Sequence, residues 1–190
     1  MQVPPFSLFS GRAPAPRAAS PGLAAPDVSR PARRPVHPAQ ALPPDLPEAL
    51  RQSPHLPPRL REALALACDE RRFIRTVEKL AAAAGCDRRT LWTHWKASVG
   101  ADADLRLQDF LHWLLLLRAA HRKSPALAWA DVADEIGIHA HTLSRLARQL
   151  TGLSLRELAA AGHAALARRF EDEVVSVVLP QARNGAGPES

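Results

Sequence analysis

Apolar residues recur at helical spacing from about residue 58 onward. Leu60, Leu64 and Ala67 fall on one side of a helix, and Pro58 suits the first turn of that helix because its missing N–H would have no partner there. These positions predict an amphipathic helix that ends near Glu70. The segments that follow are also patterned as helices, so the chain is predicted to be all-α.

A long helix is predicted from Leu105 to about Arg122, and its apolar residues cover nearly all of its faces. They are Phe110, Leu111, Trp113, Leu114, Leu115, Leu116 and Leu117. A helix with this pattern is buried between other elements. We therefore expect it to act as a rigid strut between two subdomains. Its apolar run is far too short to span a bilayer, so no membrane partner is expected.

The segment between these two helices, residues 76–100, predicts a short helix, a tight turn and a second helix. Thr76 and Asp87 are each placed to cap a helix through a side-chain oxygen. Gly85 suits the turn because glycine readily adopts the left-handed conformation. This layout is that of a helix-turn-helix, in which the second helix enters the major groove of DNA.

The same layout returns 52 residues later, where Gly137 and Gly152 repeat the spacing of Gly85 and Gly100. The equivalent pairs between these glycines are Leu80 with Val132, Ala81 with Ala133, Thr90 with Thr142 and Leu91 with Leu143. His139 stands at the capping position of the last helix in this layout, and histidine is a poorer cap than aspartate. The chain therefore carries two candidate DNA-reading helices.

Each reading helix has one face available for recognition. Leu91 and Trp95 are four residues apart and are expected in the core, so their neighbours point elsewhere. The outward residues are Arg88, Arg89, Trp92, Thr93 and Lys96 in the first helix, and His141, Ser144, Arg145 and Arg148 in the second. Arginine can pair with guanine through two hydrogen bonds, whereas Lys96 and Arg148 better suit phosphates. Trp92 has two interpretations: contact with DNA bases, or packing inside the protein.

The N-terminal residues 1–56 have a different composition. Fifteen of the 18 prolines lie at or before Pro58 and large apolar residues are few, so we expect a disordered tail. This tail is either an electrostatic arm or an extension without function, such as one produced by an upstream start codon. A capping box at Ser154 and Glu157 begins the last predicted helix, which runs to about Asp172.

The formal net charge of +6 suits a polyanionic partner, but half of it lies in the N-terminal tail and many basic proteins bind no nucleic acid. The chain has two cysteines, Cys68 and Cys86, and no visible secretion signal, so we expect reduced thiols and a cytoplasmic location. Cys86 at a helix start is either a thiol of lowered pKa or a buried turn cysteine.

No serine, cysteine or histidine arrangement predicts a nucleophile, and no glycine-rich loop predicts a phosphate cradle. His139 and His141 have no further ligands nearby for a metal ion. We therefore expect no enzyme activity, no metal and no cofactor.

Two glycine-bounded helix pairs joined by a long apolar helix resemble the DNA-binding domain of AraC-type transcriptional regulators, the AraC/XylS family. The resemblance covers about residues 58–170 and implies seven helices, with two recognition helices in successive major grooves on one face of double-stranded DNA. By position it adds Ala140 to the DNA-facing residues. RNA polymerase is a second candidate partner. The expected boundaries are a tail at 1–56, a first unit at 57–103, a central helix at 104–122, a second unit at 124–172 and a tail at 173–190.

Several positions depart from the pattern of that family. Ala147 stands where the family usually has an aromatic residue, Trp113 where it has arginine and Leu155 where it has proline. The family often carries a sensing domain, but only the proline-rich tail occupies that place here, so no effector is inferred. These departures favour an alternative, a decayed helix-turn-helix bundle that serves as a protein-interaction module. The alternatives differ in whether the arginines of the two reading helices share one face.

Overall fold

The computed structural model describes residues 41–100 and 103–180, and its regular elements in those ranges are all helices. They are α1 (Leu46–Gln52), α2 (Pro58–Cys68), α3 (Val77–Ala83), α4 (Arg88–Val99), α5 (Leu107–Arg122), α6 (Trp129–Glu135), α7 (Ala140–Thr151), α8 (Leu155–Ala161), α9 (His163–Phe170), a π-helical turn η2 (Glu171–Val175) and α10 (Ser176–Val178). The all-α prediction is confirmed for this part of the chain, although it contains more helices than the seven expected.

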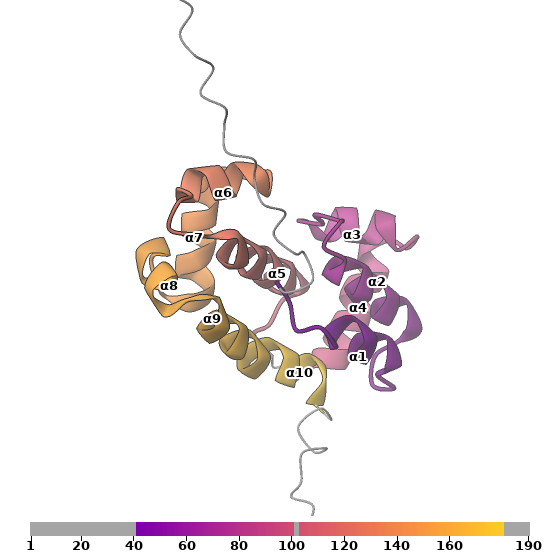
Figure 1. Cartoon of the computed structure of the whole chain (residues 1–190). Helices are drawn as coiled ribbons and strands as arrows, with labels where there is room; N and C mark the ends of the chain where they lie inside the picture. The colour runs from indigo at the N-terminus through magenta and orange to yellow at the C-terminus, as the bar shows by residue number, and fades with distance from the viewer. Residues whose placement is uncertain (1–40, 101–102, 181–190) are drawn as a thin grey trace, which may run out of the picture. The chain divides into compact units, whose positions relative to one another are not determined.

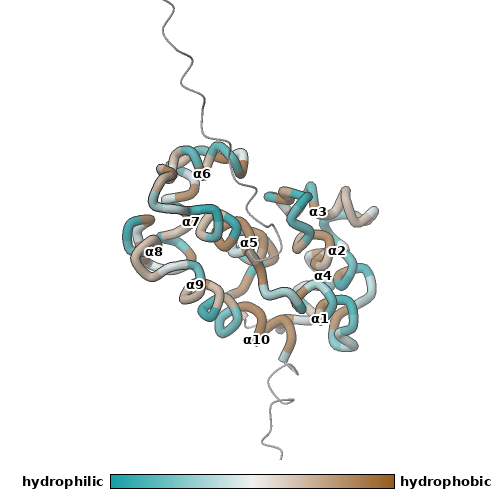
Figure 2. The backbone as a smooth tube through the Cα atoms, in the orientation of Figure 1, coloured by the Kyte–Doolittle hydropathy of each residue, from teal (hydrophilic) through white to brown (hydrophobic). Residues whose placement is uncertain are grey.

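Helix α5 lies at the centre of the described helices (Figure 1). It contacts α2 and α3 on one side and α6, α7 and α9 on the other. Its buried residues include Phe110, Leu111, Trp113 and the four leucines at 114–117, and Figure 2 shows much of this helix as hydrophobic. The prediction of a long buried helix is confirmed. Burial of one apolar rod by helices from both halves of the sequence gives these halves a shared core.

The two helix pairs, α3 with α4 and α6 with α7, have the same local geometry at an offset of 52 residues. Helices α3 and α6 each have 7 residues, and α4 and α7 each have 12. The turns close through equivalent backbone hydrogen bonds: Gly85 N–H to Ala82 O, Cys86 N–H to Ala81 O, Gly137 N–H to Asp134 O and Ile138 N–H to Ala133 O. Gly85 and Gly137 have φ of 63° and 71°, the left-handed region that favours glycine.

The predicted helix caps are present in the first pair. Thr76 Oγ1 accepts a hydrogen bond from Lys79 N–H, and Asp87 Oδ1 accepts one from Thr90 N–H at 2.8 Å. Hydrogen bonds from the Thr90 side chain and backbone lower the pKa of Asp87. His139 makes no side-chain capping hydrogen bond in the second pair, as its chemistry predicts. Helix α7 therefore begins without the side-chain cap that fixes the start of α4.

The expected disordered tail, residues 1–56, includes a segment that is helical in the structure. Helix α1 lies inside the range 1–56, packs against α2 and buries Leu46 and Leu50. Leucines four residues apart give this short helix an apolar face, and Pro47 occupies its first turn, where proline is tolerated. The high proline content concealed this local pattern. Residues 1–40, which contain the rest of the expected tail, lie outside the described residues.

Two expectations about the C-terminal part are also wrong. The last helix was expected to run unbroken from residue 154 to about Asp172, but Gly162, with φ of 79°, separates α8 from α9. The chain then stays helical beyond residue 173 through η2 and α10, because Val174 and Val178 lie four residues apart and are buried. Residues 101–102 and 181–190 lie outside the described residues.

Candidate nucleic-acid interface

Helix α4 is oriented by its buried face. Leu91 and Trp95 are fully buried, and the Trp95 Nε1–H group donates to Leu105 O at 2.9 Å. This contact holds the indole in the core, so the opposite face of α4 points outward. The five candidates on that face are Arg88, Arg89, Trp92 and Thr93, which are exposed, and Lys96, which is half-buried. Burial of Leu91 and Trp95 and exposure of Arg88, Arg89 and Thr93 agree with the prediction.

Trp92 is 58 % exposed, so its interpretation as a packed core residue is wrong. Trp92 directly follows the buried Leu91, so it lies about 100° around the helix axis from that side chain, at the border of the buried face. It presents a large apolar surface among basic and polar side chains. Such a surface can contact a thymine methyl group or stack against another ring.

Arg88 is held by an ion pair within the first helix pair. Its Nη1 lies 2.8 Å from Glu78 Oε1, and both side chains are more than half exposed. The pKa of Glu78 is lowered mainly by hydrogen bonds from its own backbone and from Thr76, with a smaller contribution from Arg88. Solvent screens an exposed pair of this kind, so it contributes little to stability. Arg88 is thus oriented by Glu78, yet a phosphate could replace this partner at low cost.

Helix α7 presents the second set of candidates. Leu143, Leu146 and Ala147 are buried, which turns His141, Arg145 and Arg148 to the exposed side, while Ala140 and Ser144 are half-buried. A shallow hollow of about 610 Å³ runs along this helix and is lined by His141, Ser144, Arg145, Arg148 and Gln149. We call this hollow the α7 surface. Its lining contains two arginines and no carboxylate, so it attracts anionic groups.

The structure places two further groups beside the second helix pair that the sequence did not assign to it. The Arg75 guanidinium, from the loop between α2 and α3, donates to Gly137 O in the turn between α6 and α7. His112, on α5, has a lowered pKa because it is partly buried and because Arg145 is nearby, while Asp109 opposes these effects. The sequence pattern did not indicate that Arg75 or His112 lies near the second helix pair, since both positions depend on how α5 packs.

The lowered pKa of His112 predicts a pH dependence of stability. In the folded state His112 releases its proton at a lower pH than in the unfolded chain, where histidine titrates near pH 6.5. The unfolded state therefore binds more protons, and stability falls as pH drops below this value until the folded-state pKa is passed. The urea midpoint of the parent should fall more between pH 7.5 and pH 5 than that of His112→Gln. A His141→Gln variant, which changes an exposed histidine, should behave as the parent; equal losses in all three proteins would contradict the prediction.

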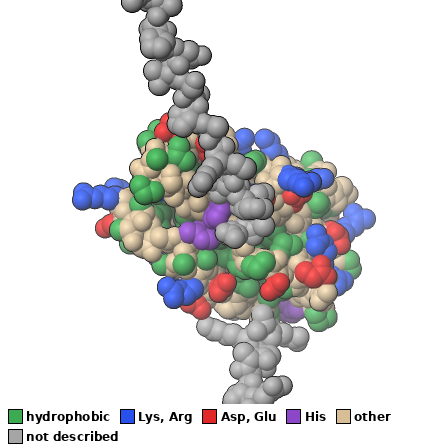
Figure 3. Space-filling model, viewed as in Figure 1, with side chains coloured by type: hydrophobic (Ala, Val, Ile, Leu, Met, Phe, Trp, Pro, Cys, Tyr) green, Lys and Arg blue, Asp and Glu red, His purple; other side chains and the backbone are tan. Residues whose placement is uncertain are grey.

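The basic side chains do not form a single patch on the face of the molecule that Figure 3 shows. On the face drawn in Figure 3, Lys and Arg side chains are dispersed, and Asp and Glu side chains lie among them along the lower edge. The candidate interface is therefore defined by the outward residues of α4 and α7 and not by total charge.

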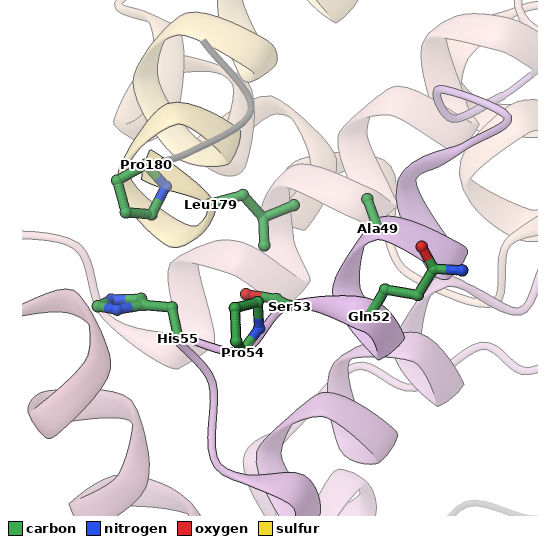
Figure 4. A pocket seen from close by; sticks show the side chains of 7 residues that line it. All are labelled: Ala49, Gln52, Ser53, Pro54, His55, Leu179 and Pro180. Atoms are coloured by element: carbon green, nitrogen blue, oxygen red, sulfur yellow. The ribbon is translucent and has the colours of Figure 1, made fainter. Parts of the chain in front are cut away.

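The pocket in Figure 4 and the two cysteines are less suited to a functional site than the outward faces of α4 and α7. The pocket in Figure 4 has a volume of about 220 Å³, is lined by Ala49, Gln52, Ser53, Pro54, His55, Leu179 and Pro180, and has few polar groups directed into it. Burial raises the pKa of Cys68 to about 12 and also raises the pKa of Cys86, so the interpretation of Cys86 as a thiol of lowered pKa is wrong. Within residues 41–100 and 103–180, no group of three or more His, Cys, Asp or Glu side chains could hold a metal ion.

No protein-family model matches the chain, and neither a curated protein nor a solved structure matches it. Among the helices of the described ranges, none has the combined length and apolar character needed to cross a bilayer.

Proposed function

We propose that this protein is a sequence-specific DNA-binding transcriptional regulator of the AraC type, in which two helix-turn-helix units occupy adjacent major grooves. Under this proposal α4 and α7 are the recognition helices, and double-stranded DNA is the partner. Their outward residues would face one side of the duplex. RNA polymerase is the expected second partner of such a regulator.

The observation that carries this proposal is the repeated geometry of the two helix pairs. Helix lengths, glycine turns and turn hydrogen bonds recur at a 52-residue offset, and both outer helices expose polar and basic side chains. Recognition helices about one helical turn of DNA apart, roughly 34 Å, meet successive major grooves on one face. The buried helix α5, which contacts elements of both pairs, is suited to maintain such a separation.

The chemistry of the exposed residues suits distinct roles on DNA. Arg89 and Arg145 are exposed and can each pair with guanine through two hydrogen bonds. Lys96 and Arg148 lie later in their helices, where side chains reach phosphates more readily than base edges. Trp92 adds an apolar contact that could distinguish thymine by its methyl group.

The alternative is a protein-interaction module built on the same bundle. It is favoured by the Arg88–Glu78 ion pair, which reduces the positive charge of α4, and by the exposure of Trp92. Tryptophan is enriched at the energetic centres of protein interfaces. The two functions differ in whether any DNA sequence is preferred.

The experiment that tests the proposal is selection of bound sequences from a random pool of duplex DNA by the full chain. The expected result is a two-part motif whose half-sites are centred about 10 base pairs apart. Recovery of no enriched sequence would overturn DNA recognition and leave the interaction module. Enrichment of a single short half-site would show that only one recognition helix reads bases.

The selected site then allows a residue-by-residue prediction. Arg145→Ala should weaken binding to that site by about 1–3 kcal/mol and relax the preference at one base position. Lys96→Ala should weaken binding to all sequences about equally and reduce the salt dependence. Arg156→Ala removes an exposed arginine from α8, outside both recognition helices, and should leave base preference unchanged. Gel-shift titrations at two salt concentrations measure these effects, and parent-like behaviour of both Arg145→Ala and Lys96→Ala would refute this assignment.

A further inference from the structure

One side chain from the loop before the first helix pair contacts the turn of the second pair directly. Arg75 lies in the loop before α3 and donates through Nη1 to Gly137 O, 62 residues away in the turn between α6 and α7. Gly137 has φ of 71°, and a Cβ atom built on it would come within 3.5 Å of Arg75 Nη1. The guanidinium therefore rests on the glycine turn itself. Among the described residues, this is the hydrogen bond that connects the first helix pair's entry loop to the second pair's turn.

The backbone of Arg75 is itself held by α5. Gln108 Nε2 donates to Arg75 O at 2.8 Å, and Gln108 Oε1 accepts from Val77 N–H at 3.3 Å. These two bonds fix the orientation of the amide, so Nε2 also faces His112 Nε2 at 2.8 Å. His112 Nε2 must then accept, which agrees with its lowered pKa. Arg75 is thus supported at its backbone by the central helix and at its side chain by the second pair.

We propose that Arg75 is a positioning residue that fixes the orientation of the first helix pair relative to the second. The DNA-binding part of this inference rests on the proposed function. Neighbouring base pairs are about 3.4 Å apart, so a small change in the separation of α4 and α7 is enough to shift the preferred half-site spacing by one base pair. Contacts through α5 already limit the distance between α4 and α7. The hydrogen bond from Arg75 to Gly137 O limits this distance further. Arg75 therefore sets spacing specificity without contacting a base.

The first test compares binding to the selected site with binding to versions that have one base pair added or removed between the half-sites. Arg75→Ala should lose about fivefold of the parent's discrimination between these spacings, and Arg75→Lys should retain most of it because lysine can also donate to Gly137 O. Arg71→Ala is the matched control, since it removes an equal charge from an exposed side chain three residues after the end of α2. Unchanged discrimination in Arg75→Ala would overturn the inference.

The second test measures the geometry without DNA. Spin labels are attached at Ala97→Cys on α4 and Gln149→Cys on α7, two exposed positions that correspond at the 52-residue offset. The background carries Cys86→Ser, while the native Cys68 thiol is buried and unreactive. Double electron–electron resonance should give a narrow distance distribution for the parent and for Arg71→Ala, and a broader one for Arg75→Ala.

The two tests separate the inference from the proposed function. A broader distribution in Arg75→Ala supports the positioning role even if no variant binds DNA, in which case the regulator proposal alone fails. A distribution that stays as narrow as the parent's overturns the positioning role, whatever the DNA-binding results. Circular dichroism of each variant checks that the helices remain folded.

Discussion

Replacing Trp95 with alanine is expected to lower the free energy of unfolding by about 4 kcal/mol. The side chain is 1 % exposed, and its ring centroid lies 5.9 Å from that of Phe110 on α5. Its Nε1–H group also donates to Leu105 O, which would lose this partner. The substitution removes a large buried volume and leaves a carbonyl without its donor, so a cavity cost and a hydrogen-bond cost combine.

Urea unfolding followed by circular dichroism measures this loss, because changes in tryptophan fluorescence would confuse a comparison of tryptophan variants. Trp92→Ala is the matched control: it removes the same side chain from the same helix but at a position that is 58 % exposed. We expect it to change stability by less than about 0.5 kcal/mol. Similar losses from the two substitutions would show that α4 does not pack through the face assigned here.

Trp95 also shows how the two helix pairs differ. Its equivalent at the 52-residue offset is Ala147, which is fully buried. The second pair therefore has a much smaller side chain at the same core position. Phe170 on α9 packs against Phe110 and Trp113 of α5, with ring centroids 6.2 and 6.0 Å away. Aromatic volume in that half of the core is thus supplied from α5 and α9.

The parts of the fold that could be predicted depend on short-range interactions. Thr76 and Asp87 cap helices because their side chains reach backbone N–H groups three residues away. Gly85 and Gly137 occupy left-handed turns that few other residues tolerate. Burial of Leu91 follows from helical periodicity. Each of these features is determined by residues within one or two helical turns, so a pattern in the sequence is sufficient to locate it.

The missed features depend on contacts that are distant in the sequence. Helix α1 was missed because the segment is rich in proline. Its two buried leucines stabilise it by packing against α2, a contact that the local sequence does not reveal. The link from Arg75 to Gly137 spans 62 residues and involves a backbone carbonyl, which leaves no trace in the side-chain pattern. Trp92 was ambiguous because tryptophan suits both core and interface. The candidate site was therefore predictable as two helix faces, whereas its supporting contacts were not.

Replacing Arg118 with leucine is expected to cost about 3 kcal/mol of folding stability. Arg118 lies on α5 and is only 3 % exposed. Its guanidinium donates to Ala67 O at 2.9 Å, to Asp69 O at 3.1 Å and to Arg72 O at 3.4 Å. These carbonyls belong to the end of α2 and the loop after it, where helix acceptors have no partner within the helix. Burial lowers the pKa of Arg118, but arginine stays protonated and keeps all its donors.

The matched control is Arg122→Leu, one helical turn later on α5. Both guanidinium groups lie over the Phe73 ring, at 5.7 Å for Arg118 and 5.0 Å for Arg122, so both variants lose a cation–π contact. Arg122 donates to none of those carbonyls, and its loss should cost about 1 kcal/mol. Equal losses in urea unfolding would mean that the ring contact, and not the carbonyl bonds, stabilises this region. Since Arg118 holds the loop that carries Arg75, a larger loss from Arg118→Leu should be accompanied by a broader separation of α4 and α7 in the spin-label measurement.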